Sequence, residues 1–307
     1  MHTMTEVAHA PYPRLARFIE RFGHPLFLAA ALAVWWNSRR SDGVTLAILV
    51  VTLLLMGTLE RLVPAVPDWR LTAGAKLRLA GVYVLGLVVS VGLIGAYEAV
   101  LAPALGGVRA GVGLALWPHG WPVLAQALLL YFGSDLLYFG VHRAIHNSSA
   151  LWRITGHGFH HGFQNLHAIN AGTNHPFELV LVVLPLVLLA AISGATGDAV
   201  AGAGVLLLVN TTLAHANVKM QTPGFSRLFT CSNQHRRHHS AVFDESNTNY
   251  ACNAILWDQV FGTYGSGAVA QTGIGPTEPS LWRMFMLPFG EPEGVDTVSA
   301  RASRRQK

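Results

Sequence analysis

Histidine is the residue whose number and placement point to chemistry in this 307-residue chain. Eleven of the fifteen histidines fall between His142 and His239, in about a third of the sequence. A single histidine in an apolar chain is usually a hydrogen-bonded core residue, but a concentration of this kind needs a common cause. Neutral imidazole is the commonest metal ligand among side chains, so the distribution indicates metal binding.

Three motifs contain most of these histidines. The first is a pair four residues apart, which shares one face of a helix. The other two are His-x-x-His-His triplets, in which a helical turn brings the first imidazole near the last two. One triplet alone is compatible with a surface feature, but two triplets and a pair together predict metal ligation. The residues are His142 and His146, then His157, His160 and His161, and finally His235, His238 and His239.

Further candidates lie near these motifs. We expect His215, at the end of an apolar segment, to join the ligands, whereas His175 is either an additional ligand or a residue that supports one. Asp135 lies two turns before His142, and a buried carboxylate there is expected to hold a ligand imidazole through its second nitrogen. The alternative is that Asp135 pairs with another polar helix residue. His167 is a weaker candidate, and no role is predicted for His2, His9, His24 and His119.

The residues beside the histidines narrow the metal chemistry. A zinc protease needs Glu after the first histidine of His-Glu-x-x-His, but Arg143 and Gly158 occupy those positions. The Glu-x-x-His pairs of soluble di-iron bundles do not occur in the apolar segments. The candidate histidines outnumber the four ligands of a structural zinc site, and their number suits two metal ions with open positions. Two irons that meet dioxygen there would oxidise an unactivated C–H bond.

The elements that position the histidines belong to a membrane protein. The chain is 51% hydrophobic and 12% charged, and its mean hydropathy is +0.39, whereas soluble domains are about a quarter charged. Apolar runs at residues 24–36, 44–59, 79–105 and 122–141 predict four spans, the first of them short unless it extends backwards. Residues 179–208 form either two more spans or a re-entrant hairpin. We therefore expect an all-α membrane bundle, of six spans or of four and a hairpin, with a histidine-rich helical cap.

The basic residues predict which way the bundle faces. On this reading, 18 of the 21 Lys and Arg residues lie on the side of the histidines, and Arg39, Arg40 and Arg109 lie on the other. The active site and both termini are therefore expected in the cytoplasm, in a bacterial inner membrane or an ER-type membrane. The N-terminus does not resemble a cleaved signal peptide. Because the basic residues are scattered, nucleic acid is not an expected partner, and a metal site at the membrane surface suits a lipid that arrives laterally.

A single membrane-embedded catalytic domain is expected over residues 1–265, with the motifs in 131–264. Residues 266–307 lose hydrophobicity and are expected to form a cytoplasmic surface tail. The two cysteines, Cys231 and Cys252, form neither a disulfide framework nor a Cys-x-x-Cys metal site.

The ordered set of histidine motifs resembles the fatty acid hydroxylase/sterol desaturase superfamily of integral-membrane, non-haem di-iron oxidases. His-Pro-x-Glu at His175, His-Ala-Asn at His215, and the stretch from Asn249-Tyr250 to Tyr264 add to the resemblance. The resemblance implies nine ligands, two iron ions and dioxygen as co-substrate. It assigns as ligands His142, His146, His157, His160, His161, His215, His235, His238 and His239.

The resemblance also implies partners and supporting residues. Asn249 and Tyr250 are expected to support the ligands or to contact substrate. No fused haem or flavin domain and no cytochrome-b5-like His-Pro-Gly-Gly motif is found, so the electron donor is expected to be separate, a cytochrome b5-like protein or a ferredoxin with its reductase. The chain departs from the family pattern at Gly162 and Asn174, where members often have Ser and Arg. Because these positions are where substrate would be recognised, the resemblance does not identify the lipid.

Three functions remain open at this point. The favoured one is an oxygen-dependent hydroxylase of a fatty acyl chain, a sterol-like ring or a lipid head group. A desaturase would use the same site, because the outcome depends on where the target carbon sits relative to the oxidant. A membrane metal transporter or sensor is the alternative from another class, and it predicts ionisable or His residues within several spans, whereas the midspan regions here hold little besides Asp135 and Glu98.

Overall fold

The computed structural model describes residues 12–39, 41, 43–113, 115 and 117–290, and these form helices and no strands. His2, His9 and residues 291–307 of the expected tail lie outside the described residues. The prediction of an all-α fold is confirmed.

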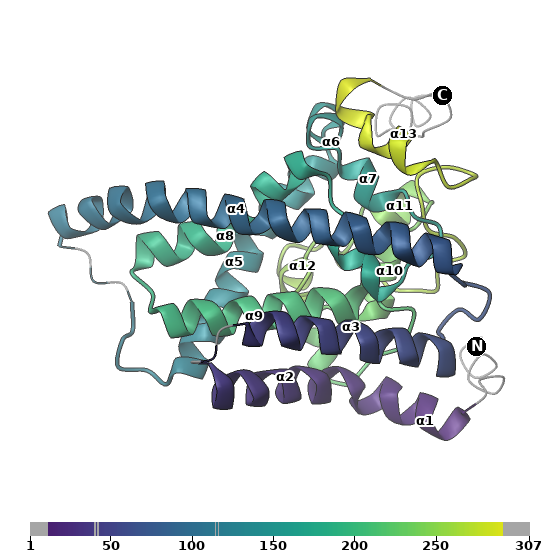
Figure 1. Ribbon diagram of the computed structural model, residues 1–307, viewed down its shortest axis with the longest axis horizontal. Coiled ribbons are helices and arrows are strands. Elements are labelled where there is room, and N and C mark those ends of the chain that lie inside the picture. Colours follow the sequence, from purple (N-terminus) through teal and green to yellow (C-terminus); the bar gives the residue numbers. More distant parts are fainter. Residues whose placement is uncertain (1–11, 40, 42, 114, 116, 291–307) are drawn as a thin grey trace.

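Six helical segments are long and apolar enough to cross a membrane, and several of them lie side by side along the long axis of the molecule (Figure 1). The first is a continuous helix in which α1 and α2 are joined by a π-helical turn, so the short apolar run does extend backwards. The segments are α1 (Pro13–Phe18), η2 (Ile19–Gly23) and α2 (His24–Ser38), then α3 (Val44–Leu62), α4 (Ala73–Gly111), α5 (Val123–His146), α8 (Pro176–Ser193) and α9 (Gly197–His215).

The helices α8 and α9 decide between the two expected topologies. They have 18 and 19 residues, close to the roughly 20 that a span needs. Gly194 ends α8 in the left-handed conformation at φ 73°, and the Thr196 side chain caps α9 by accepting from the Ala199 amide. Both arms are thus complete, capped helices, which favours six spans over four and a re-entrant hairpin.

The helix α9 lies at the centre of the bundle, where it contacts α2, α3 and α5. It is the most buried of the six segments, and its Gly202 allows close approach of the Trp35 side chain. The outer faces are apolar and exposed, as at Leu54 (68% exposed) and Leu77 (76% exposed). An exposed apolar surface around a helical bundle is what lipid contact requires. The chain is therefore a multi-pass membrane protein.

The six segments alternate in direction, so α5 and α9 end, and α8 begins, on the same side as a helical cap. The cap consists of residues 147–175 and 216–290. Its helices are α6 (Ser149–Thr155), α7 (His157–His161), η3 (Ala168–Gly172), η4 (Phe225–Arg227), α10 (Ser232–His238), α11 (Phe243–Ser246), α12 (Leu256–Val260), α13 (Leu281–Phe285) and η5 (Leu287–Phe289).

A largely buried carboxylate, with a side chain that is 10% exposed, attaches the two parts of the cap to the bundle. Glu60, near the end of α3, accepts hydrogen bonds from the Ala168 amide at 2.7 Å and from the Asn217 amide at 3.0 Å. It also lies 3.0 Å from His167 Nδ1. One side chain of a span thus fixes both cap segments near the ends of the helices that bear histidines.

The described residues after position 265 do more than cover a surface. Ile274, Met284 and Leu287 are each at most 1% exposed. Met284 packs so closely on Gly162 that a Cβ there would lie 1.9 Å from its sulfur. Residues 266–290 are therefore not simply a surface tail, because several of them pack onto α7 and neighbouring cap residues. The low mean hydropathy of this segment did not indicate that a few of its apolar residues are buried.

Candidate metal centre

The predicted histidines lie where the spans meet the cap. His142 and His146 occupy the last turns of α5, and His215 is the last residue of α9. The triplets lie on the short cap helices α7 and α10. Gly156, at φ 69°, ends α6 and allows α7 to begin at once, where a Cβ would collide with the His175 ring.

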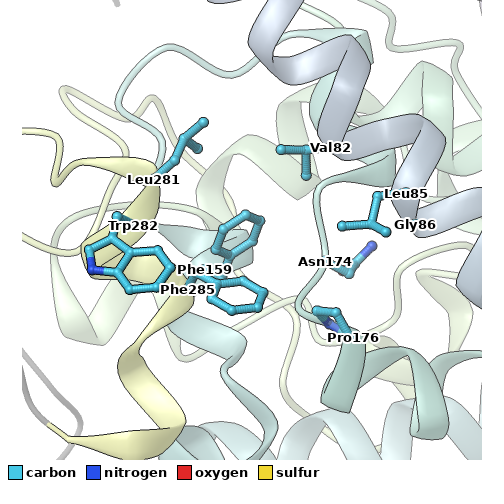
Figure 2. A pocket seen from close by; sticks show the side chains of 9 residues that line it. All are labelled: Val82, Leu85, Gly86, Phe159, Asn174, Pro176, Leu281, Trp282 and Phe285. Carbon is cyan, nitrogen blue, oxygen red and sulfur yellow. The ribbon is translucent and has the colours of Figure 1, made fainter.

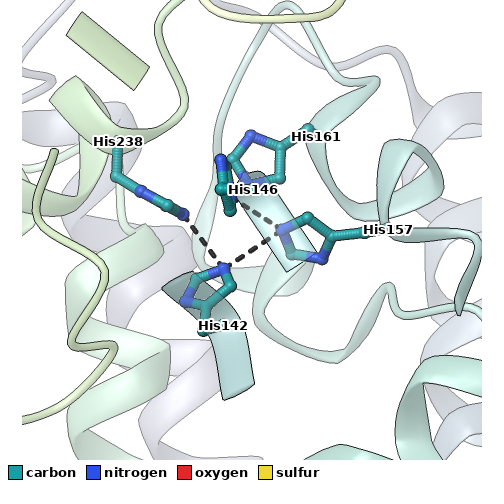
Figure 3. Close-up of side chains that lie close together, drawn as sticks. All are labelled: His142, His146, His157, His161 and His238. Carbon is teal, nitrogen blue, oxygen red and sulfur yellow. Dashed lines mark hydrogen bonds between the residues drawn. The ribbon is translucent and has the colours of Figure 1, made fainter. Parts of the chain in front are cut away.

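The nine side chains converge in two groups, in each of which one possible donor atom per residue lies within 4.8 Å of every other. Figure 3 shows the rings of the first group pointing toward a common centre. The first group consists of His142, His146, His157, His161 and His238, and the second of His160, His215, His235 and His239. The expected convergence is found, while the role of these residues as ligands stays a prediction.

The two triplets divide their imidazoles in opposite ways. On α7, the residues four apart, His157 and His161, belong to the first group, and His160 belongs to the second. On α10 and its C-cap, His235 and His239, which are four residues apart, belong to the second group, and His238 belongs to the first. Neighbouring residues on a helix point about 100° apart, so each triplet contributes to both groups. The rings of His161 and His239 stack at 4.2 Å and 14°, where the groups meet.

The second nitrogen of five rings faces an acceptor. His142 Nδ1 donates to the Tyr250 carbonyl at 2.6 Å. His157 Nδ1 donates to Glu178 Oε1 at 2.7 Å. The other three Nδ1 atoms donate to backbone carbonyls, from His215 to Thr211 at 2.7 Å, from His238 to Thr248 at 2.9 Å and from His160 to Thr173 at 3.3 Å.

These contacts assign the proton of these five rings. A carbonyl oxygen or an ionised carboxylate only accepts, so Nδ1 bears the hydrogen and Nε2 of the neutral ring carries an exposed lone pair. Yet the Nε2 atoms approach closely, at 3.1 Å between His142 and His157, and at 3.2 Å both between His142 and His238 and between His160 and His215. The first two are dashed in Figure 3. With a proton at neither nitrogen, the lone pairs face each other and need a cation between them.

The nitrogen separations fit such a cation. Two nitrogens about 2.1 Å from a metal and at a right angle lie about 3.0 Å apart. His146 and His157 have Nε2 atoms 2.9 Å apart, and His235 Nε2 lies 3.0 Å from that of His215. In the described part of the chain, His161 Nε2 is also buried with no hydrogen-bond partner. The donor set therefore fits two ions that accept imidazole.

Burial keeps the cap imidazoles neutral. Each of the nine rings belongs to a residue at most 5% exposed. Desolvation lowers the pKa of His157 to about 3 and that of His160 to about 4. Burial and then the neighbouring imidazoles hold the pKa of His161, His238 and His239 well below 6.5. Neutral rings are the form that binds a metal.

Asp135 does not have the contact expected for it. Its carboxylate accepts from the Ala254 amide at 2.8 Å and from the Asn253 amide at 3.1 Å, and not from a ligand imidazole. The position of Asp135 on the helix was compatible with a contact to a ligand imidazole and with a contact to another polar group. In the structure the loop after Tyr250 fills the space beside Asp135. Asp135 thus acts on the site indirectly, because it fixes the loop whose Tyr250 carbonyl orients His142.

Asn249 and Tyr250 also position this loop. Asn249 has φ 55°, a conformation that Asn tolerates, and its side chain donates to the Gln234 and Gly265 carbonyls. The Tyr250 ring lies 5.5 Å from that of His146, and its hydroxyl donates to the Asn247 carbonyl. Both residues therefore fix the loop beside the candidate ligands, and their role in supporting a bound metal stays a prediction. A contact with substrate stays a prediction.

The other histidines of the described residues lie outside both groups. His175 is the N-cap of α8, where its Nδ1 accepts from the Phe177 amide at 3.1 Å. Its ring packs against Phe285 at 4.9 Å. His167 contacts Glu60, and His24 Nε2 lies 2.7 Å from Asn210 Oδ1. His175 thus supports the fold near the site, and the structure does not place it with the possible ligands.

The structure adds three residues for which the sequence predicted no role, although Glu178 belongs to the His-Pro-x-Glu motif. Glu178 is fully buried against His157, and Tyr138 donates to it at 3.4 Å. Trp152 lies edge-on against the ring of His157 at 4.9 Å and shields the first group. An acidic residue in the first turn of an apolar helix is the signal that identifies Glu178. Tyr138 and Trp152 have no distinctive signal in the sequence.

Comparisons with known proteins agree with this geometry. The family model for fatty acid hydroxylase matches residues 127–263. The chain is 30% identical over 254 residues, 78% of its length, to the ornithine lipid hydroxylase OlsE of Rhizobium tropici, of which it covers 73%. It is 25% identical over 148 residues, 48% of its length, to the very-long-chain aldehyde decarbonylase GL1-8 of Oryza sativa subsp. indica, of which it covers 54%. No solved structure matches significantly.

The family assignment rests on the OlsE relative and the family model together, and it agrees with the resemblance in the histidine motifs. The chain belongs to the fatty acid hydroxylase superfamily and is an oxygen-dependent oxidoreductase.

Proposed function

We propose that this protein is a di-iron hydroxylase that inserts one oxygen atom into a membrane lipid. The observation that carries the proposal is the pair of buried imidazole groups whose unprotonated Nε2 atoms face one another at 3.1 to 3.2 Å. Such donors favour a transition-metal ion in the +2 state over a hard cation, which would be bound by oxygen ligands. The family relation supports iron over zinc or copper.

Two bound irons would supply the reduction of dioxygen and the oxidation of a C–H bond. The overall reaction takes R–H, O₂, two electrons and two protons to R–OH and water. The nine histidines would hold the ions, and His142, His157 and their partners keep the reactive nitrogens unprotonated. Burial of the rings excludes bulk water, which limits loss of the oxidant to side reactions.

The substrate is proposed to be a membrane lipid because the donor groups lie where the spans meet the cap. A lipid can reach this level by lateral movement, with its polar part at the interface. The relative OlsE is named for the hydroxylation of an ornithine lipid. That name supports a lipid of the same general kind, either at its acyl chain or at its head group, as the first substrate to test.

The donor groups and both termini are proposed to lie on the cytoplasmic side. The 18 basic residues on the side of the cap, against three on the other, support this orientation. Electrons would then come from a separate cytoplasmic carrier, a cytochrome b5-like protein or a ferredoxin with its reductase. In a bacterium the membrane would be the inner membrane.

The transporter or sensor hypothesis receives no support from the placement of the donors. The donors that belong to candidate spans are His142, His146 and His215, which lie in the last turns of those spans, so the described donors do not form a path across the bilayer. Desaturation at the same site is distinguished by its product, which loses two hydrogens, whereas a hydroxylated product gains one oxygen.

The experiment is lipid mass spectrometry of cells that do and do not express the protein, with iron analysis of the purified protein. We expect a lipid that is heavier by one oxygen, labelled from ¹⁸O₂, and about two irons per chain. His160→Ala should abolish the product and lower the iron content. The exposed His119, at the other end of the bundle, provides the control His119→Ala, which should change neither. Iron-free protein, or product formation by His160→Ala, contradicts the proposal.

A further inference from the structure

A pocket of about 310 Å³ lies between α4 and the cap. Figure 2 shows side chains of α4 on one side of it and aromatic side chains of α7 and α13 on the other. The residues that define its walls include Val82, Leu85, Phe159, Asn174, Leu281 and Phe285. The volume lies near the lower end of the range for small-molecule sites, about 300 to 1,000 Å³.

The chemistry of the walls is that of a hydrocarbon site. Most of the described lining side chains are aliphatic or aromatic, and Asn174 is a polar one among them. Aromatic walls come from Phe159, which is 3% exposed, and from Phe285 of α13. Burial of each methylene in such a site is worth about 0.8 kcal/mol by transfer from water, so the pocket favours an alkyl chain.

The pocket adjoins the surface that would face lipid. Leu85 is 52% exposed and belongs to α4, a candidate span. The neighbouring Val84 and Val88 are 59% and 65% exposed, so the apolar surface of α4 continues beyond the pocket. At the cap side, Trp282 of α13 is 68% exposed and also lines the pocket, and an indole in that place suits a membrane interface. A chain can therefore enter without crossing water.

The pocket is lined by residues that are close in sequence to the candidate metal centre. Phe159 lies on α7 between ligand candidates of both groups. Asn174 follows Thr173, whose carbonyl accepts from His160 Nδ1, and Pro176 begins the helix turn that carries Glu178. Three wall residues are thus at most two positions from groups that hold or orient the imidazoles.

We propose that this pocket binds an alkyl segment of the membrane lipid substrate, which enters from the bilayer between α4 and α13. The inference rests on the proposed function and specifies the side from which the substrate approaches. The bound segment anchors the lipid while another part of it reacts. Residue Asn174, where the chain departs from the family pattern, then lies at the binding site and contributes to the choice of lipid.

The first test is photolabelling of the full-length protein in phosphatidylcholine vesicles that contain a fatty acid with a diazirine on its chain. Labelled peptides are identified by mass spectrometry. We expect labels on the wall segments, in α7 around Phe159 and in α13 around Phe285, in competition with unlabelled fatty acid. Labels confined to the outer faces of the spans, without competition, would overturn the proposal.

The second test fills the pocket from its α4 wall. Leu85→Trp places an indole in the pocket, which should displace about two methylenes of the bound alkyl chain. At about 0.8 kcal/mol for each methylene, this should lower the competed labelling about tenfold. Val84→Trp is the matched control on the next residue, which is exposed and does not line the pocket, and it should label like the wild-type protein. Equal labelling of both variants would overturn the proposal.

The outcomes separate this inference from the proposed function. If the wild-type protein hydroxylates a lipid and Leu85→Trp leaves both the apparent KM and the labelling unchanged, the pocket assignment is wrong and the hydroxylase stands. If the walls are labelled and Leu85→Trp removes the label, but cells make no hydroxylated lipid, the pocket stands and the reaction is wrong.

Discussion

The contact between Glu178 and His157 offers the sharpest perturbation of the metal centre. Both side chains are fully buried, and Oε1 lies 2.7 Å from Nδ1. Glu178→Gln retains the shape and an amide oxygen that can still accept from Nδ1, but it removes the carboxylate that makes the imidazole a stronger donor. Loss of such a partner typically costs 10- to 100-fold in metal affinity, or about 1.4 to 2.7 kcal/mol.

The structure predicts which ion is affected. His157 Nε2 lies 3.1 Å from His142 Nε2 and 2.9 Å from His146 Nε2, so the loss should fall on the first group. In competition with a chelator, the variant should lose about one iron at a concentration at which the wild-type protein retains about two, as counted by plasma mass spectrometry.

The control is Glu98→Gln, the same chemical change at an exposed position of α4. It should keep both the iron content and the turnover of the wild-type protein. If Glu178→Gln holds both irons with wild-type affinity, the carboxylate does not tune the site, and the reasoning from the 2.7 Å contact is wrong.

Three further predictions address the other contacts. His215→Ala should lower the iron content, because it removes one of the four donors of the second group. His175→Ala should keep the iron content but lower the free energy of unfolding by about 1 kcal/mol, because it removes the N-cap of α8. Iron analysis and thermal unfolding separate the two, and equal iron loss would place His175 among the ligands. Asp135→Asn should cost about 1 to 3 kcal/mol in thermal unfolding, because an amide N–H then faces backbone donors, and an unchanged melting temperature contradicts the anchoring role. A membrane-impermeant maleimide should label Ser41→Cys in intact bacterial cells and Ser266→Cys only after permeabilisation. The reverse pattern would show that the cap faces the periplasm and would contradict the proposed orientation.

The bundle was predictable because its signal is carried along the sequence. Runs of apolar residues with few charges predict spans wherever they reach the required length, and the structure has a helix for each run. The missing information concerned the helix ends. The first span gains its length from residues 13–23, which contain charged side chains and so fall outside a purely apolar run.

The ligand candidates were predictable for a different reason. Histidines at i, i+3 and i+4 have a chemical meaning whatever the fold, so eight of the nine residues could be named from their spacing, and His215 from its place at the end of an apolar segment. Their division between two ions was not in the spacing, because it depends on how α7 and α10 face each other. His160 and His161 are neighbours in the sequence and still belong to different groups.

Asp135 shows why roles beyond the ligands need the structure. The sequence places a carboxylate and a histidine on one helix face, but the partner of the carboxylate comes from a loop about 120 residues later, at Asn253 and Ala254. Nothing local in the sequence of α5 indicates that loop. The same holds for Glu60, whose partners come from two separate cap segments.

The acceptors that orient the imidazoles are the part of the site that sequence comparison is least able to detect. Four of the five Nδ1 atoms donate to backbone carbonyls, which any residue supplies, so substitutions at Thr173, Thr211 or Thr248 need not change the contact. What must be preserved is the path of the backbone, and this depends on side chains elsewhere. Asp258 illustrates the point, because it accepts from the Tyr250 amide at 2.8 Å while the Tyr250 carbonyl accepts the hydrogen bond from His142 Nδ1. The metal centre therefore extends, in energetic terms, to carboxylates that touch neither a ligand nor a substrate.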